Sequence, residues 1–282
     1  MTHESLATLE GREHFLGIAL SAAREAATFV HAGWRNHPHV EHKGRVDLVT
    51  QFDRDSERML REHLTRETPF PVVGEEQGGD RATGEHDATW FVDPIDGTTN
   101  FVHGHPFYCV AIGLLADGLP VVGAIVAPAL GVEWRGVAGG EAKRNGALCR
   151  VSTVGRFTDA LLATGFPYDR STSDDNNFDA FVTIKRKCQA VRRCGSAALD
   201  LCLVADGTYD GYWEKKLAPW DCIAGAAIVL AAGGRLSDYA GNQADLLSGQ
   251  LLATNGAIHD ALVDELQKVP SSHFPPTPRY RR

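Results

Sequence analysis

The sequence lacks the features that would place it in a membrane, in a secretory pathway or among metal-finger proteins. No apolar run reaches the roughly 18 residues that a spanning helix needs, no Asn-x-Ser/Thr acceptor occurs, and residues 1–13 are polar rather than signal-like. The six cysteines form no CxxC pair and no zinc-type spacing, which indicates reduced, buried thiols. We therefore expect a cytoplasmic protein with no membrane partner.

An excess of positive charge is also lacking, and so are two common catalytic motifs. The formal net charge is −8, whereas a protein whose main ligand is nucleic acid presents a net basic surface. Neither a nucleophile elbow nor a Gly-rich nucleotide loop with its lysine occurs. What remains is a 282-residue chain with 43% hydrophobic and 23% charged residues, long enough for one large core or two subdomains.

The stretch Trp90–Phe101 is the most informative part of the chain. Its first half has the β-branched and aromatic character of a buried strand, and Pro94 is expected to end that strand because proline has no N–H to donate. Asp93 and Asp96 would then lie in a turn and repel each other unless a cation sits between them. Their oxygens and the Ile95 carbonyl favour Mg²⁺, Mn²⁺ or Ca²⁺ over zinc.

The residues that follow favour an anion. Gly97 permits a positive φ, and residues 98–100 offer hydroxyls and N–H groups suited to phosphate. The competing interpretation is an ordinary loop, since Asp, Pro and Gly dominate turns in all proteins.

Four further acids are candidates for the same site, and each also has an ordinary structural explanation. Two lie beside predicted helices, where an acid complements the helix dipole or caps the first turn. The other two follow predicted strands, where a glutamate is usually exposed to solvent. The first pair is Asp53 and Asp221, and the second pair is Glu75 and Glu214.

The segment Gly195–Ala197 opens another predicted helix. A glycine needed for close packing and a serine cap would explain it. The functional alternative is that the helix start hydrogen-bonds a substrate hydroxyl. Arg192 or Arg193, directly before it, could instead serve a subunit interface.

Three segments together resemble the signatures of the inositol monophosphatase family, part of a larger group of Mg²⁺-dependent, lithium-sensitive phosphatases. They are Asp93-Pro94-Ile95-Asp96-Gly97-Thr98-Thr99-Asn100-Phe101, Gly74-Glu75-Glu76, and Trp220-Asp221 with Ala224-Gly225. The segment Asp47–Thr50 followed by Asp53 is similar to a further family segment. The resemblance implies a mixed α/β fold: the α-β-α-β-α sandwich with mixed sheets of the inositol monophosphatase and fructose bisphosphatase fold, usually as a homodimer.

The resemblance also implies a role for each matching residue. It implies ligands for two Mg²⁺ ions, with a third, weaker ion placed by Asp53. These ligands are Glu75, Asp93, the Ile95 carbonyl, Asp96 and Asp221. Glu75 and Thr98 would orient a metal-activated water for attack on phosphorus. The substrate would be held by Ile95, Asp96, Gly97, Thr98, Gly195, Ser196, Ala197, Glu214 and Asp221.

These expectations lead to one main hypothesis and two alternatives. The main hypothesis is a phosphoric monoester hydrolase acting on a small phosphorylated polyol, myo-inositol monophosphate. One alternative is a phosphatase of the same fold for histidinol phosphate, a sugar bisphosphate or a phosphoadenosine nucleotide; the other is a regulatory or binding protein that retains the fold. We expect an N-terminal subdomain (1–151) with most metal ligands, a C-terminal subdomain (152–269) with the substrate segments, and a disordered tail (270–282).

Overall fold

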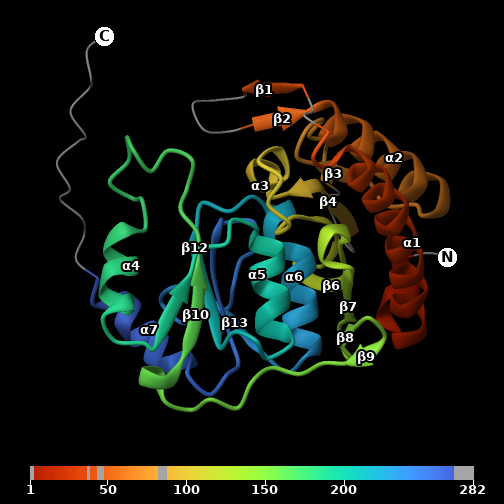
Figure 1. Cartoon of the computed structure of the whole chain (residues 1–282). Helices are drawn as coiled ribbons and strands as arrows, with labels where there is room; N and C mark the ends of the chain where they lie inside the picture. Colours follow the sequence, from red (N-terminus) through yellow and green to blue (C-terminus); the bar gives the residue numbers. More distant parts are fainter. Residues whose placement is uncertain (1–2, 37–38, 43–47, 82–87, 270–282) are drawn as a thin grey trace, which may run out of the picture.

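The protein, seen here in a computed structural model, is described over residues 3–36, 39–42, 48–81 and 88–269. Helices and sheets alternate in layers, from α4 and α7 at the left of Figure 1 to α1 and α2 at the right. The expected α-β-α-β-α sandwich is therefore confirmed. One outer layer consists of α1 (Leu9–Gly33) and α2 (Gln51–Glu67). The middle layer consists of α5 (Ala197–Ala205) and α6 (Pro219–Ala231). The other outer layer consists of α4 (Phe178–Lys185) and α7 (His259–Gln267).

The sheet beneath α1 and α2 has seven strands in the order β3-β4-β5-β6-β7-β8-β9. Its first pair, β3 and β4, is parallel, and every later pair is antiparallel. The strands are β3 (Val72–Gly74), β4 (Ala88–Asp96), β5 (Cys109–Ala116), β6 (Leu119–Ala127), β7 (Val132–Val137), β8 (Lys143–Arg144) and β9 (Ala147–Leu148). The pair Asp117-Gly118 between two apolar runs predicts a hairpin, and a hairpin there joins β5 to β6, with φ values of 51° and 74°.

The second sheet has five strands in the order β11-β10-β12-β14-β13 and mixes parallel with antiparallel pairs. Its strands are β10 (Leu161–Thr164), β11 (Ala190–Arg192), β12 (Gly211–Lys215), β13 (Arg235–Ser237) and β14 (Gln250–Thr254). A short ribbon, β1 (Val40–His42) with β2 (Leu48–Thr50), and the short helix α3 (Thr98–Val102) lie near the edge of the larger sheet in Figure 1. The short 3₁₀ segments are His3–Ala7, Pro128–Leu130 and Phe157–Asp159.

Strand β4 contains the main departure from the sequence-based expectation. The strand does not end at Pro94; it runs on to Asp96, and all nine of its residues are buried. Its pairing with β5 shifts between Asp93, opposite Ala111, and Asp96, opposite Cys109. The predicted turn is therefore wrong. The strand bulges instead, and a bulge accommodates proline because a bulged residue need not donate to the ladder.

Three other expectations are corrected. Helix α6 begins at Pro219, so Asp221 lies inside its first turn rather than before the helix, as the preference of proline for the first helical position explains. Glu214 lies within β12 rather than after it. The sequence pattern predicts a helix over Asp174–Lys187, but α4 begins only at Phe178, because the preceding polar residues form turns and bends. The six cysteines are free thiols as expected, five of them buried and Cys194 half-buried.

Three apolar cores separate the layers. One lies between α1/α2 and the larger sheet, one surrounds α5 and α6 between the sheets, and one lies between the smaller sheet and α4/α7. The larger sheet uses residues 72–148 and the smaller one residues 161–254, so the predicted subdomain division after residue 151 falls between them and stays a prediction. The tail expected at 270–282 lies outside the described residues. No helix in the described ranges is long and apolar enough to cross a membrane.

Close packing of α6 on the larger sheet gives a stability prediction. A Cβ added at Gly123 would collide with the Ala224 carbonyl oxygen of α6, so Gly123→Ala should lower the free energy of unfolding by about 1–3 kcal/mol. Gly17 in α1 has no atom within 4 Å of its added Cβ, so the control Gly17→Ala should raise it by about 0.5–1 kcal/mol. Urea unfolding measures both; equal effects would contradict the packing described.

Candidate active site

A cavity of about 290 Å³ lies where β3 and β4 end and α6 begins. Because β3 and β4 are parallel neighbours, the residues after both strands come to one edge of the sheet. The cavity is lined by four carboxylates together with backbone and hydroxyl groups of the β4–α3 connection. Among the lining residues are Glu75, Asp93, Ile95, Asp96, Gly97, Thr98 and Asp221. The structure thus brings all the predicted metal ligands to one cavity.

Local hydrogen bonds fix two of the carboxylates. The Ile95 N–H donates to Asp93 Oδ1 at 2.9 Å, across the bulge of β4. The Ala218 N–H donates to Asp221 Oδ2 at 2.7 Å, so Asp221 caps the helix whose first turn it occupies. Each bond anchors one oxygen of its carboxylate and thereby orients the second.

Asp96 joins the two halves of the chain. Its Oδ2 accepts hydrogen bonds from the Ser196 hydroxyl at 2.6 Å and from the Ala198 N–H at 2.7 Å. Ser196 is also the N-cap of α5, whose Leu199 N–H donates to its hydroxyl oxygen. The serine cap expected at this helix is therefore present, and the same side chain positions a site acid.

The carboxylates raise one another's pKa. Burial raises the pKa of Asp93 well above its ordinary value, and the negative charges of the neighbouring carboxylates raise it further. Burial, Asp96 and Glu75 likewise raise the pKa of Asp221. For Asp96 the hydrogen bonds from α5 oppose the effect of burial, and the pKa is about 6. A bound cation would relieve this repulsion, which is the electrostatic property expected of a metal site.

Asp53 lies behind the cavity and is fully buried. The Thr50 N–H and hydroxyl donate to Asp53 Oδ2 at 2.7 and 2.6 Å, which completes a capping box at the start of α2. The Thr98 hydroxyl lies 3.0 Å from both Asp53 Oδ1 and the Ile95 carbonyl oxygen. The helix-capping role considered for Asp53 is present, and through Thr98 the same carboxylate reaches the cavity.

A second cavity, of about 100 Å³, adjoins the first and shares Asp96 and Asp221 with it. It is lined by the remaining predicted substrate residues: Gly195, Ser196, Ala197 and Glu214. Glu214 accepts a hydrogen bond from the Tyr212 hydroxyl, and burial raises its pKa to about 7. The Glu214 carboxylate packs against Gly165, and a Cβ at residue 165 would collide with it.

A third cavity, of about 490 Å³, was not expected from the sequence. It shares Asp96, Gly97 and Thr98 with the first and is otherwise rich in basic side chains. These are His42, His103, Arg170 and Arg193. His103 directly follows α3 in the chain, whereas the fold brings His42 of β1 to the same cavity.

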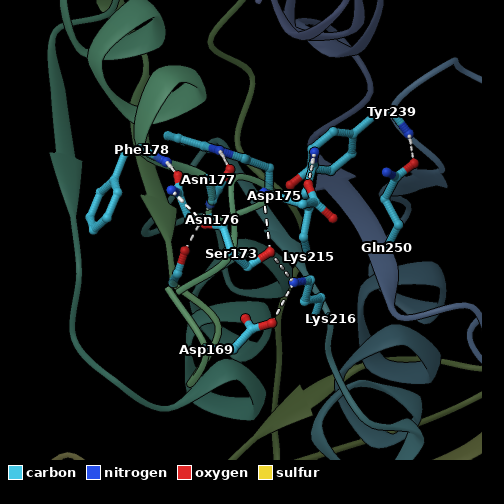
Figure 2. Close-up of polar contacts among 12 residues, drawn as sticks. Asp169, Ser173, Asp175, Asn176, Asn177, Phe178, Lys215, Lys216, Tyr239 and Gln250 are labelled. Atoms are coloured by element: carbon cyan, nitrogen blue, oxygen red, sulfur yellow. Dashed lines mark hydrogen bonds and ion pairs between the residues drawn. The ribbon is translucent and has the colours of Figure 1, made fainter. Parts of the chain in front are cut away.

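The segment of residues 165–177 contributes Tyr168 to the lining of all three cavities. Figure 2 shows how this segment contacts the last residue of β12, Lys215, and the residue that follows it, Lys216. Lys216 Nζ lies 2.7 Å from Asp169 Oδ2 and 2.9 Å from Ser173 Oγ, and Lys215 Nζ lies 2.7 Å from Asp175 Oδ1. Exposed ion pairs contribute only about 0–1 kcal/mol each, whereas Asn177, at the end of the segment, is buried and hydrogen-bonds with Thr164, Gly165 and Trp213.

Glu57 is a supporting residue that the sequence did not reveal. Its carboxylate is fully buried beneath Gly74, where it accepts hydrogen bonds from the Glu76 N–H at 2.6 Å and the Gln77 N–H at 3.0 Å. Arg61 donates to the same carboxylate at 2.9 Å. Glu57 thus shapes the turn that presents Glu75, yet in the sequence it is one of many charged residues on a helix.

The donor set fits a hard divalent cation. All the side-chain and backbone groups expected as ligands offer oxygen, which suits Mg²⁺ and similar ions. Within the described ranges, no three histidine, cysteine, aspartate or glutamate side chains form a ready-made group that could hold a metal ion. An open arrangement of this kind is compatible with Mg²⁺, which usually keeps several waters and binds through one or two carboxylates plus substrate phosphate.

Comparison with known proteins agrees with this geometry. The model of the inositol monophosphatase family matches residues 12–271. An inositol-1-monophosphatase of Synechocystis sp. is 40% identical over 91% of this chain and 90% of the relative. A Pseudomonas aeruginosa protein named Nus factor SuhB is 36% identical over 93% of this chain and 97% of its own length. The structure of inositol monophosphatase from Anabaena (Nostoc) sp. superposes with a TM-score of 0.84 and 39% identity, covering 92% and 97% of the two chains.

The fold and the acidic cavity define a phosphoric monoester hydrolase of a generally metal-dependent class. The chain belongs to the inositol monophosphatase family.

The raised pKa values predict how stability depends on pH. Between the ordinary carboxyl pKa of about 4 and the raised values, about 6 for Asp96 and about 7 for Glu214, the folded protein binds more protons than the unfolded chain. Stability in EDTA should therefore fall as pH rises through this window, and Mg²⁺ should raise the melting temperature more at pH 8 than at pH 5. Calorimetry measures both. In Glu214→Gln the pH dependence should be weaker; a melting temperature in EDTA that rises from pH 5 to pH 8 would contradict the account.

Proposed function

We propose that this protein hydrolyses a small phosphorylated polyol, with myo-inositol monophosphate as the leading candidate, and that it does so with Mg²⁺. The observation that carries the proposal is the pair of adjoining cavities that share Asp96 and Asp221. One is lined by carboxylates and suits cations with a phosphate group; the other ends at Glu214 and suits hydroxyls.

The proposed ligands for two ions are the acids of the first cavity and one carbonyl. Glu75, Asp93 and the Ile95 carbonyl would hold one ion, and Asp93 with Asp96 and Asp221 the other. Asp53 would help to place a third, weaker ion. When bound, the ions would supply two effects, a lowered pKa of bound water and neutralisation of charge on the phosphoryl oxygens.

Protein groups would position the reacting water and the phosphate. The Thr98 hydroxyl can donate its proton to Asp53 Oδ1 or to the Ile95 carbonyl, so its lone pairs remain available to accept a hydrogen bond from water. Glu75, which lines the same cavity, would accept a hydrogen bond from that water and so orient it. The N–H groups of Gly97 and Thr98 would donate to phosphate oxygens, favouring the charge that develops in the transition state.

The second cavity would hold the leaving alcohol. Glu214, oriented by Tyr212, would accept a hydrogen bond from a ring hydroxyl, and backbone groups of Gly195–Ala197 would contact the same ring. Because Asp96 and Asp221 line both cavities, the bond between phosphorus and the alcohol oxygen would lie beside them.

Replacing one shared acid gives a direct test. Asp96→Asn removes a charge from the cavity while leaving an oxygen that can accept from α5, so Mg²⁺-dependent phosphate release should fall by more than about 100-fold with the circular dichroism spectrum preserved. Asp264→Asn, on the exposed face of α7, is the matched control and should retain full activity. A folded Asp96→Asn enzyme with undiminished turnover would contradict the ligand assignment.

A second candidate substrate class is favoured by the basic cavity. Arg170 and Arg193 line it together with His42 and His103, and this surface suits a second anionic group, as in a sugar bisphosphate. A panel that compares myo-inositol 1-phosphate with fructose 1,6-bisphosphate separates the two classes. We expect a higher kcat/KM for the inositol ester; a preference for the bisphosphate of more than tenfold would reverse the ranking.

Family likeness further supports a cytoplasmic homodimer inhibited by lithium. We propose these properties on that likeness alone.

A further inference from the structure

Helix α5 contains one acidic residue, Asp200, and this residue lines the cavity of about 100 Å³ that also contains Glu214. The helix reads Ala-Ala-Leu-Asp-Leu-Cys-Leu-Val-Ala, and Asp200 is its only charged or hydrogen-bonding side chain apart from a cysteine. Asp200 is only 2% exposed. It lines the 100 Å³ cavity together with Glu214.

One oxygen of Asp200 has no partner. Its Oδ1 is buried without a hydrogen bond among the described residues. A buried polar atom left unpaired costs about 1–3 kcal/mol, and most such atoms in proteins are paired by protein or water. Asp200 lines the cavity, and the hydrogen-bonding capacity that its carboxyl leaves unused could be satisfied there by a ligand hydroxyl.

Helix stability does not explain this aspartate. An acid in the first turn can stabilise a helix by about 0.3–1 kcal/mol when it is charged and exposed. Burial, together with the charges of Glu214 and Asp96, raises the pKa of Asp200 well above its ordinary value, against a smaller opposite effect of Arg193. The charged form is thus disfavoured, and an apolar residue would pack in this layer at lower cost. A buried acid in an apolar helix departs from the usual pattern without adding stability, and such departures are expected at binding and catalytic sites.

We propose that Asp200 is a specificity-determining residue that, together with Glu214, binds two hydroxyl groups on the polyol part of the substrate. The inference rests on the proposed function, because Asp96 and Asp221 connect this cavity to the phosphate end. It adds a chemical requirement: the preferred alcohol carries at least two ring hydroxyls besides the esterified oxygen. An alcohol without them would leave Asp200 unpaired in the complex, and such an unpaired group is strongly discriminating.

The test compares Asp200→Asn and Asp200→Leu with the wild-type enzyme on two substrates, myo-inositol 1-phosphate and p-nitrophenyl phosphate. The readout is the ratio of the two kcat/KM values. We expect each variant to lower this ratio at least about tenfold, mainly through a higher KM for the inositol ester. Asp264→Asn should leave the ratio unchanged. Both variants should melt at or above the wild-type temperature, because they remove an unpaired buried carboxyl.

Every outcome of this experiment either supports or overturns the inference about Asp200. Equal loss on both substrates means that Asp200 only supports the fold, and a change in ratio of less than twofold means that it does not contact the alcohol; either result overturns the inference while phosphatase function stands. A wild-type enzyme that cleaves neither ester overturns both proposals. If the variants do not fold, the wild-type enzyme with monodeoxy-inositol phosphates gives the answer: loss of either of two different hydroxyls should lower kcat/KM about tenfold, and sensitivity at no more than one position contradicts the inference.

Discussion

Repulsion among buried carboxylates is the constraint on which this structure depends. Acids from β4, from the first turn of α6 and from the residue that follows β3 line one cavity, and each of the three aspartates there has a pKa raised by burial or by its neighbours. At pH values above the ordinary carboxyl pKa, such an arrangement lowers the free energy of unfolding of the protein without a bound cation. Its benefit is that a bound divalent cation would neutralise this repulsion, so that cation binding would stabilise the folded protein. Stability and function therefore oppose each other at this site.

The rest of the fold holds the acids in place against that repulsion. The bulge of β4 aligns Asp93 and Asp96 at the end of the sheet, and the start of α5 fixes Asp96 through two hydrogen bonds. The first turn of α6 carries Asp221, and α6 packs directly on glycines of β5 and β6. The middle helix layer thus sets the separation of the acids, which is why residues far apart in sequence form one site.

The sequence predicts those parts of the site that are encoded locally. The sequence carries, in its family motifs, four acids that line one cavity, Glu75, Asp93, Asp96 and Asp221, and the character of residues 90–92 predicts the buried strand found there. It could not reveal features that depend on neighbours distant in the chain. Pro94 signals a strand end unless the partner strand allows a bulge, and Glu57 or Lys216 is an ordinary charged residue until the fold supplies its partners. Asp200 is similarly hidden, because an acid in a helix says nothing about which layer will bury it.

Direct observation of the cation tests the central claim most simply. Crystals of this protein soaked in Mn²⁺ and measured at the manganese absorption edge should show anomalous density between Asp93, Asp96 and Asp221, with further density on the side of Glu75. Absence of any anomalous peak in that cavity, with the acids turned toward protein partners instead, would contradict the account.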